Sequence, residues 1–331
     1  MARLTRFFDP FIGFLVGTVV LASLLPARGA WADRVDVLAD IGIVLLFFIH
    51  GAKLSRRNLI DGGRNLRLQL AVLACTFLVF PVLGLALSSL PMLSASLATG
   101  FLFLALLPST VQSSIALTAI ARGNVAAAVC SATFSNFAGI FITPLLVGLL
   151  LGGAGELSIM ASVQKIVLNL LLPFLAGHLL RPLVGDFIAR HKKATTMVDR
   201  GSILLVVYSA FGAAVVGGIW SEVGLADLVW LLCLNAVLLA AIQLVIHLAG
   251  RMLGLAQEDR VVLLMCGSVK SLAAGVPMAG VLFPAAGVGA IILPLMIFHQ
   301  MQLITCAIQA RHMAAAPSGE GGEAPLPAAQ R

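Results

Sequence analysis

Charged residues are scarce in this sequence, and their scarcity excludes a soluble globular protein. Only 11% of the 331 residues are Asp, Glu, Lys or Arg, whereas 60% are hydrophobic. A soluble domain needs about 25% charged residues to cover its surface. Lipid is therefore the solvent for most of this chain, and there is no room for a sizeable soluble domain.

The residues from which membrane enzymes build their sites are also missing. The five cysteines all lie inside apolar runs and show neither metal-ligand spacing nor a disulfide framework. No Asp or Glu lies deep in an expected membrane segment, and Asp40, near the start of the second, comes closest. An enzyme would need paired acids, a metal cluster or a nucleophile with its base. We therefore expect neither an enzyme nor a cofactor or confident metal site.

Long apolar runs account for most of the chain. One crossing needs about 20 apolar residues as a helix, and an open chain can cross lipid only as helices. We therefore expect an all-α integral membrane protein of about ten transmembrane helices. The runs lie near 11–26, 35–52, 66–90, 95–121, 125–151, 158–180, 201–220, 226–249, 261–283 and 287–309.

Lys and Arg are distributed unequally between alternate connections. Seventeen of the 21 lie at the two ends or in the loops after the second, fourth, sixth and eighth runs, and only Arg28 and Arg34 lie in the opposite loops. Basic residues mark the cytoplasmic side, so we expect both termini in the cytoplasm of a bacterial inner membrane. The Lys and Arg residues form no single basic patch, so we do not expect nucleic acid as a partner.

The two ends of the chain need separate interpretation. The first run has a basic start, and Ala30-Trp31-Ala32 resembles a signal-peptidase site. Cleavage would leave nine spans, which do not form two equal halves, so we expect the first span to be retained. Residues 314–331 are rich in Ala, Pro, Gly and Glu, and we expect a disordered cytoplasmic tail.

The runs divide into two halves of five at the glycine-rich segment Gly152–Gly155. An odd number of spans in each half places the halves in opposite orientations, as in the inverted repeats of many secondary transporters. We therefore expect a first five-helix repeat over 1–155 and a second, inverted repeat over 156–313.

The fourth and ninth runs, which would correspond in the two repeats, are both interrupted near their midpoints. Pro108 precedes a polar segment in the fourth, and the ninth contains a polar segment between Cys266 and Pro277. Proline removes a helical donor, and glycine lowers the cost of irregular backbone. Freed backbone groups at membrane depth have to line a cavity or bind something. Two discontinuous helices at matching positions predict one site between them.

Lys270 is the most informative single residue. It lies about ten residues into the ninth run, roughly 15 Å from either surface, where a cation costs at least ~2.5–3.5 kcal/mol. A lysine at this depth can hold an anionic substrate, fill a cation site as a tethered ammonium, or exchange a proton. The structural alternative is a lysine held only by helix-end carbonyls. Lys165, nearer the end of its run, can extend to the headgroups.

With these segments, the chain resembles the bile acid:sodium symporter family, in the branch typified by sodium/bile acid cotransporter 7. The resemblance covers about residues 5–312, and its two long segments are specific. The segments that carry it are Phe8–Phe11, Gly51–Ser55, Leu107–Ser114, Ala121–Val125, Cys266–Leu272 and Gly275–Met278.

The resemblance implies a panel domain of helices 1, 2, 6 and 7 and a core domain of helices 3–5 and 8–10, in which helices 4 and 9 unwind and cross. Sodium-coupled members hold two sodium ions with a Ser-Asn pair, hydroxyls and a Glu-x-x-x-Gln element. Here Ser113 and Ser114 replace the pair, and Cys266 and Lys270 replace Glu and Gln. We expect at least one sodium site to be lost; a residual site would use Ser113, Ser114 and Thr133.

The sequence thus predicts a secondary transporter that moves a small organic anion by alternating access. Lys270 would replace a sodium ion as a tethered cation or proton carrier, with proton or sodium as the coupling ion. Sodium-coupled anion symport, a channel and a non-transporting membrane regulator are the alternatives. The expected site residues are Ser109, Thr110, Gln112, Ser113, Ser114, Ser131, Thr133, Ser135, Asn136, Cys266, Ser268, Lys270 and Ser271.

Overall fold

The computed structural model describes residues 10–53, 65–151 and 167–315, and all regular elements in these ranges are helical. Phe8, Asp9, the division at Gly152–Gly155, Lys165 and the tail from 316 lie outside the described residues. The elements are α1 (Pro10–Leu24), α2 (Ala30–Lys53), α4 (Leu66–Ala74), η2 (Cys75–Val79), α5 (Phe80–Ser88), α6 (Ala95–Leu106), α7 (Gln112–Ile120), α8 (Val125–Leu151), η3 (Val167–Leu171), α10 (Leu172–Leu179), α11 (Arg181–Arg190), α12 (Lys192–Val216), α13 (Ile219–Glu222), α14 (Leu225–Met252), α15 (Gln257–Gly267), α16 (Leu272–Leu282) and α17 (Ala285–Ala315).

The described helices confirm a multi-pass helical membrane protein. Seven spans in these ranges are long and apolar enough to cross a membrane, or eight if α10 and α11, which are bent by 90°, count as one with η3. Two shorter apolar helices, Gly13–Leu24 and Ala95–Leu106, match the first expected run and the first half of the fourth. The arrangement as ten spans in two inverted repeats stays a prediction.

Two helices begin earlier than the sequence analysis expected. α2 begins at Ala30, and Asp33 in its first turn interacts favourably with the helix dipole. Asp40 therefore lies ten residues into the helix of this candidate span. α12 begins at Lys192 rather than near 201, so the end of the expected cytoplasmic loop is helical.

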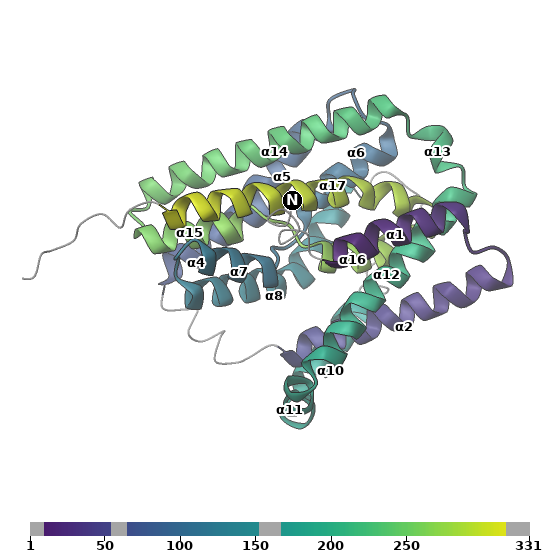
Figure 1. Cartoon of the computed structure of the whole chain (residues 1–331), viewed down its shortest axis with the longest axis horizontal. Helices are drawn as coiled ribbons and strands as arrows, with labels where there is room; N and C mark the ends of the chain where they lie inside the picture. The colour runs from purple at the N-terminus through teal and green to yellow at the C-terminus, as the bar shows by residue number, and fades with distance from the viewer. Residues whose placement is uncertain (1–9, 54–64, 152–166, 316–331) are drawn as a thin grey trace, which may run out of the picture.

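The helices form two groups (Figure 1). α1, α2, α10, α11 and α12 pack together, and α2 contacts both α10 and α12 extensively. The helices from α4 to α8 and from α14 to α17 form the second group. α12 joins the groups because it packs against α16 and α17 as well as α2.

α2 and α10 cross at backbone contact distance, and glycine makes this possible. A Cβ on Gly51 would lie 2.0 Å from the carbonyl oxygen of Phe174, and a Cβ on Gly177 would lie 2.0 Å from that of Phe48. Small residues allow such close approach between membrane helices. The position of α10, and of the α11 that follows it, depends on these two glycines.

Asp259 ties together three helices of the second group. Its carboxylate accepts hydrogen bonds from the side-chain amides of Asn65, at 2.7 Å, and Asn124, at 3.1 Å. Asn65 also accepts from the amide of Leu68 at the start of α4, and Asn124 from that of Ala127 at the start of α8. The ends of α4, α8 and α15 are thereby fixed to one another.

The glycine crossing gives a test of the fold. Gly177→Ala should lower the free energy of unfolding by about 1–3 kcal/mol or more, because the added methyl group meets a backbone carbonyl that cannot move aside. Gly148→Ala in α8 is the matched control, since a Cβ there has nothing within 4 Å. Thermal unfolding in detergent measures both. Equal melting temperatures for the two variants would contradict the close contact.

Candidate functional site

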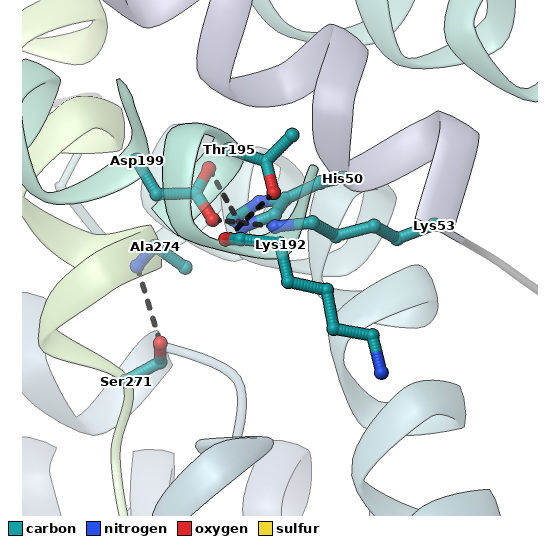
Figure 2. Close-up of polar contacts among 7 residues, drawn as sticks. All are labelled: His50, Lys53, Lys192, Thr195, Asp199, Ser271 and Ala274. Atoms are coloured by element: carbon teal, nitrogen blue, oxygen red, sulfur yellow. Dashed lines mark hydrogen bonds and ion pairs between the residues drawn. The ribbon is translucent and has the colours of Figure 1, made fainter. Parts of the chain in front are cut away.

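Both interruptions expected from the sequence are present in the structure. The first separates α6, which ends at Leu106, from α7, which begins at Gln112. The second separates α15, which ends at Gly267, from α16, which begins at Leu272. Ser271 caps α16 by accepting a hydrogen bond from the amide of Ala274 at 3.1 Å (Figure 2).

The two interrupted segments contact each other directly. The backbone amide of Ser271 donates to the carbonyl of Pro108 at 2.9 Å. The hydroxyl of Ser109 donates to the carbonyl of Cys266 at 2.6 Å. The broken spans therefore meet where each is broken, and each uses the polar groups of the other to satisfy its own free backbone.

Lys270 lies fully buried at this meeting point. Its ammonium donates to the carbonyl oxygens of Thr76 at 2.8 Å, Ala105 at 2.8 Å and Leu107 at 2.7 Å. It also lies 4.0 Å from the ring centroid of Phe80, a favourable cation–π distance. Carbonyl oxygens only accept hydrogen bonds, so three such bonds need the three N–H groups of a charged lysine.

Pro81 leaves the first of these carbonyls without a backbone partner. The π-helical turn η2 makes the amide of Phe80 donate to Cys75, five residues back, rather than to Thr76. The next residue, which would reach Thr76 in the same pattern, is Pro81, and proline has no N–H. The carbonyl of Thr76 is thus free to accept from Lys270.

The break at Pro108 leaves the other two carbonyls free. Proline disfavours helical backbone at the residue before it, and Leu107 is extended. In a continuous α-helix the amide of residue 109 would donate to Ala105 and that of residue 111 to Leu107. The amide of Ser109 donates instead to the hydroxyl of Ser135 at 3.0 Å, and α7 begins only at Gln112. The carbonyl of Leu107 lies beyond the last residue of α6. Both face the lysine.

Side chains of α8 satisfy further backbone groups of the broken span. The hydroxyl of Thr143 donates to the carbonyl of Leu106 at 2.8 Å, and the amide of Asn136 donates to that of Ser109 at 2.6 Å. Buried backbone groups without partners would each cost about 1–3 kcal/mol. The polar residues of the expected fifth span thus support the break in the fourth.

Gln302 on α17 holds the backbone of Lys270 from both sides. The amide of Lys270 donates to the Gln302 side-chain oxygen at 2.7 Å, and the Gln302 side-chain nitrogen donates back to the Lys270 carbonyl at 2.8 Å. Sequence reasoning missed Gln302, Thr76 and Pro81. A proline inside the third apolar run was the available signal, since it frees a carbonyl one turn earlier.

A cluster of neutral hydroxyls lies beside the crossing. Thr110 contacts the hydroxyls of Ser113 at 2.5 Å and Ser114 at 3.1 Å. Ser114 is fully buried, and so is Cys266, the position that the family resemblance equates with a sodium-binding carboxylate. The thiol of Cys266 donates to the carbonyl of Ala128 at 3.8 Å. None of these four expected site residues carries a carboxylate.

The remaining expected site residues lie around the crossing in less direct positions. Ser268 turns toward α17, where it contacts Cys306 at 3.7 Å. Ser131 is buried, and its hydroxyl has no hydrogen-bond partner among the described residues. Thr133 is half-buried. Gln112 is exposed and lines a cavity formed mainly by the ends of α2, α10, α11 and α12.

The two hydrogen bonds between Gln302 and the backbone of Lys270 predict that substitutions of two glutamines on α17 differ strongly in their effect on stability. Gln302→Leu should destabilise the protein by about 2–4 kcal/mol, because it leaves a buried amide and a buried carbonyl without partners. Gln300→Leu changes a half-buried neighbour on the same helix and should have little effect. Thermal unfolding of the purified proteins compares them. A Gln302→Leu variant as stable as Gln300→Leu would show that these two hydrogen bonds do not form.

Comparisons with known proteins agree with this architecture. Residues 9–315 match the SBF-like CPA transporter family. An uncharacterized protein of Pseudomonas aeruginosa is 51% identical, over 92% of this chain and 93% of its own. The putative symporter YfeH of Escherichia coli is 49% identical, over 93% and 94%. Sodium/bile acid cotransporter 7 of Rattus norvegicus is 27% identical, over 88% and 89%.

The match covers all of the described helices, including both interrupted spans and Lys270. The apolar helices and the crossing fit a protein that moves a solute through the membrane rather than one that makes or breaks bonds. The chain belongs to the SBF-like CPA transporter family and is a multi-pass membrane transporter, not an enzyme.

Proposed function

We propose that this secondary transporter moves a small organic anion across the bacterial inner membrane by alternating access, about the crossing of α6–α7 with α15–α16. The observation that carries the proposal is the Lys270 ammonium on three carbonyls at that crossing. The names of the relatives, a putative symporter and a sodium/bile acid cotransporter, support transport of a solute together with an ion.

Lys270 fits the role of a tethered cation better than its two other roles. Three oxygen ligands at 2.7–2.8 Å surround its charge, much as oxygen ligands surround a bound metal cation. All three N–H groups are used, so none remains for an anionic substrate. A proton released from Lys270 would leave one of these carbonyls without a donor. The ammonium thus takes the place of a sodium ion.

The usual sodium-coupled symport is the second candidate. A residual sodium site would use the hydroxyls of Ser113, Ser114 and Thr133, with Thr110 nearby. These ligands are neutral, and sodium, as a hard cation, binds best where oxygen ligands carry charge. A non-transporting regulator is the third candidate, and it would need no ligand-dependent change at the crossing. The coupling ion of the proposed transporter is a proton or sodium.

The fold we propose for this function has two inverted five-helix repeats, over 1–155 and 156–313, followed by a tail over 314–331. Interruptions near the middle of the fourth and ninth expected spans support the correspondence. The group of α1, α2, α10 and α12 would form the panel domain, and the helices of the second group would form the core domain. Motion between these domains would expose the crossing alternately to each side.

The proposed orientation places both termini in the cytoplasm. Its support is the bias of Lys and Arg, with seventeen of 21 in the connections assigned to that side. The ends of α2 and α15 that carry Lys53 and Arg260 would then face the cytoplasm, as would the C-terminal ends of α7 and α10, which Arg122 and Arg181 follow.

Replacing the lysine tests the tethered cation. Wild-type protein should melt at the same temperature in sodium and in potassium chloride of equal ionic strength. Lys270→Ala should be less stable by about 3–5 kcal/mol, because three buried carbonyls lose their donors. Sodium or ethylammonium ions, which can enter the vacated space, should restore part of this loss. Thermal unfolding of the purified protein gives both quantities.

Lys270→Met is the matched control, because its apolar side chain fills the space without offering a donor. It should be destabilised and should not respond to either cation. Stabilisation of the wild type by sodium would show that a sodium site survives, and the tethered-cation role would then be abandoned. Equal responses of the Ala and Met variants would also rule it out.

A further inference from the structure

A cavity of about 690 Å³ reaches the first residue of α7, Gln112. Five elements line it: the end of α2, α10, α11, the first turn of α12 and the first residue of α7. The first four belong to one helix group and α7 to the other. The cavity therefore lies between the two groups. Its residue from α7, Gln112, directly precedes Ser113 at the crossing.

The charged groups of this cavity are mainly basic. Lys53, Arg181 and Lys192 line it, together with the imidazole of His178 and a single carboxylate, that of Asp186. Thr195 and Thr196 add neutral hydroxyls. A ligand in this space would meet more positive than negative charge.

Lys53 is already paired, but the two other cations are available. Its ammonium lies 2.7 Å from the carboxylate of Asp199, which His50 also approaches, at 4.0 Å. Figure 2 shows these side chains converging, while the Lys192 side chain extends away from them. Within the described ranges Arg181 and Lys192 form no salt bridge. Their two charges face one carboxylate, so the cavity keeps a positive excess.

One uncharged feature of the cavity also favours an anion. α7 begins at Gln112 without a side-chain cap, so the amides of its first turn lack intrahelical acceptors and the positive end of its dipole is open.

We propose that this cavity holds the acid group of a small organic anion with one or two negative charges, bound by Arg181 and Lys192 beside the N-terminus of α7. The inference rests on the proposed transport function and assigns its charge recognition. Lys270 has no N–H group left for the substrate, so the substrate's charge has to be matched elsewhere. The cavity supplies two cations that form no salt bridge with any described residue.

The test uses full-length protein in phosphatidylcholine nanodiscs and follows its melting temperature with two probes. 2-Naphthoate carries one carboxylate, and 2-naphthamide has the same shape without charge. The naphthoate should raise the melting temperature of the wild type in a saturable way, and the amide should not. Arg181→Gln and Lys192→Gln should each weaken the apparent affinity about tenfold or more, because each removes one charge-assisted contact.

Two further variants separate recognition from misfolding. Lys193→Gln is the matched control, because Lys193 is an exposed neighbour that does not line the cavity; it should bind naphthoate like the wild type. Asp186→Asn should bind more tightly, since it removes the one carboxylate of the lining. A gain of affinity cannot result from a damaged fold.

Four results would overturn the proposal: no response of the wild type to naphthoate, an equal response to the amide, undiminished binding by the two glutamine variants, or competition by lipid. For the last, nanodiscs containing phosphatidylglycerol are compared. If this lipid raises the melting temperature through Arg181 and Lys192 and abolishes the naphthoate response, the occupant is a lipid headgroup.

Failure of the transport function would look different. Naphthoate binding that follows the expected pattern, but without naphthoate counterflow in proteoliposomes, would leave the site intact and remove transport of this ligand. Binding that persists unchanged in Lys270→Met would show that the cavity works independently of the tethered cation. If the cavity variants do not change naphthoate binding as expected, while sodium and ethylammonium still stabilise Lys270→Ala, only the present inference is overturned.

Discussion

A single buried charge, the Lys270 ammonium on three carbonyls, determines how the middle of this protein is arranged. The three carbonyls come from two different spans, and the lysine comes from a third. A charge at this depth is costly unless its hydrogen bonds are complete. Conversely, the free carbonyls at the breaks are costly unless a donor reaches them. The carbonyls accept the hydrogen bonds of the ammonium, and the ammonium supplies the donors that the carbonyls lack. The irregular backbone and the lysine therefore depend on one another.

The same arrangement separates two tasks that one cation cannot perform together. A lysine that uses every N–H group to hold helices cannot also recognise a ligand. Two cations without a salt bridge to any described residue lie instead on α11 and α12, in the cavity that also reaches α7. The helices within each group are held together firmly. In the first group α2 and α10 are in close contact at their glycines, and in the second Asp259 hydrogen-bonds to Asn65 and Asn124. The boundary between the groups is therefore the natural place for movement.

The sequence predicted the parts of this arrangement that leave a local mark. Pro108, the polar residues after it and the glycine before Lys270 indicated both breaks, and the depth of the lysine indicated its importance. The residues that form hydrogen bonds with Lys270 were harder to predict. Thr76 contributes a backbone atom, which any residue type would carry, and Gln302 lies 32 residues away on another helix. The sequence analysis also began α2 too late, because it followed apolar runs and left out Asp33 and Arg34, which precede residue 35.

The dependence of Lys270 on Pro81 and on the break at Pro108 limits which substitutions the crossing can tolerate. Pro81 matters for the N–H that it lacks, Pro108 for the extended backbone at Leu107, and the lysine for the N–H groups that it brings. Loss of the lysine alone leaves three acceptors without a donor, whereas an amide gained at position 81 would compete with the lysine for the carbonyl of Thr76. A variant without the lysine therefore needs new donors or continuous helices at both breaks.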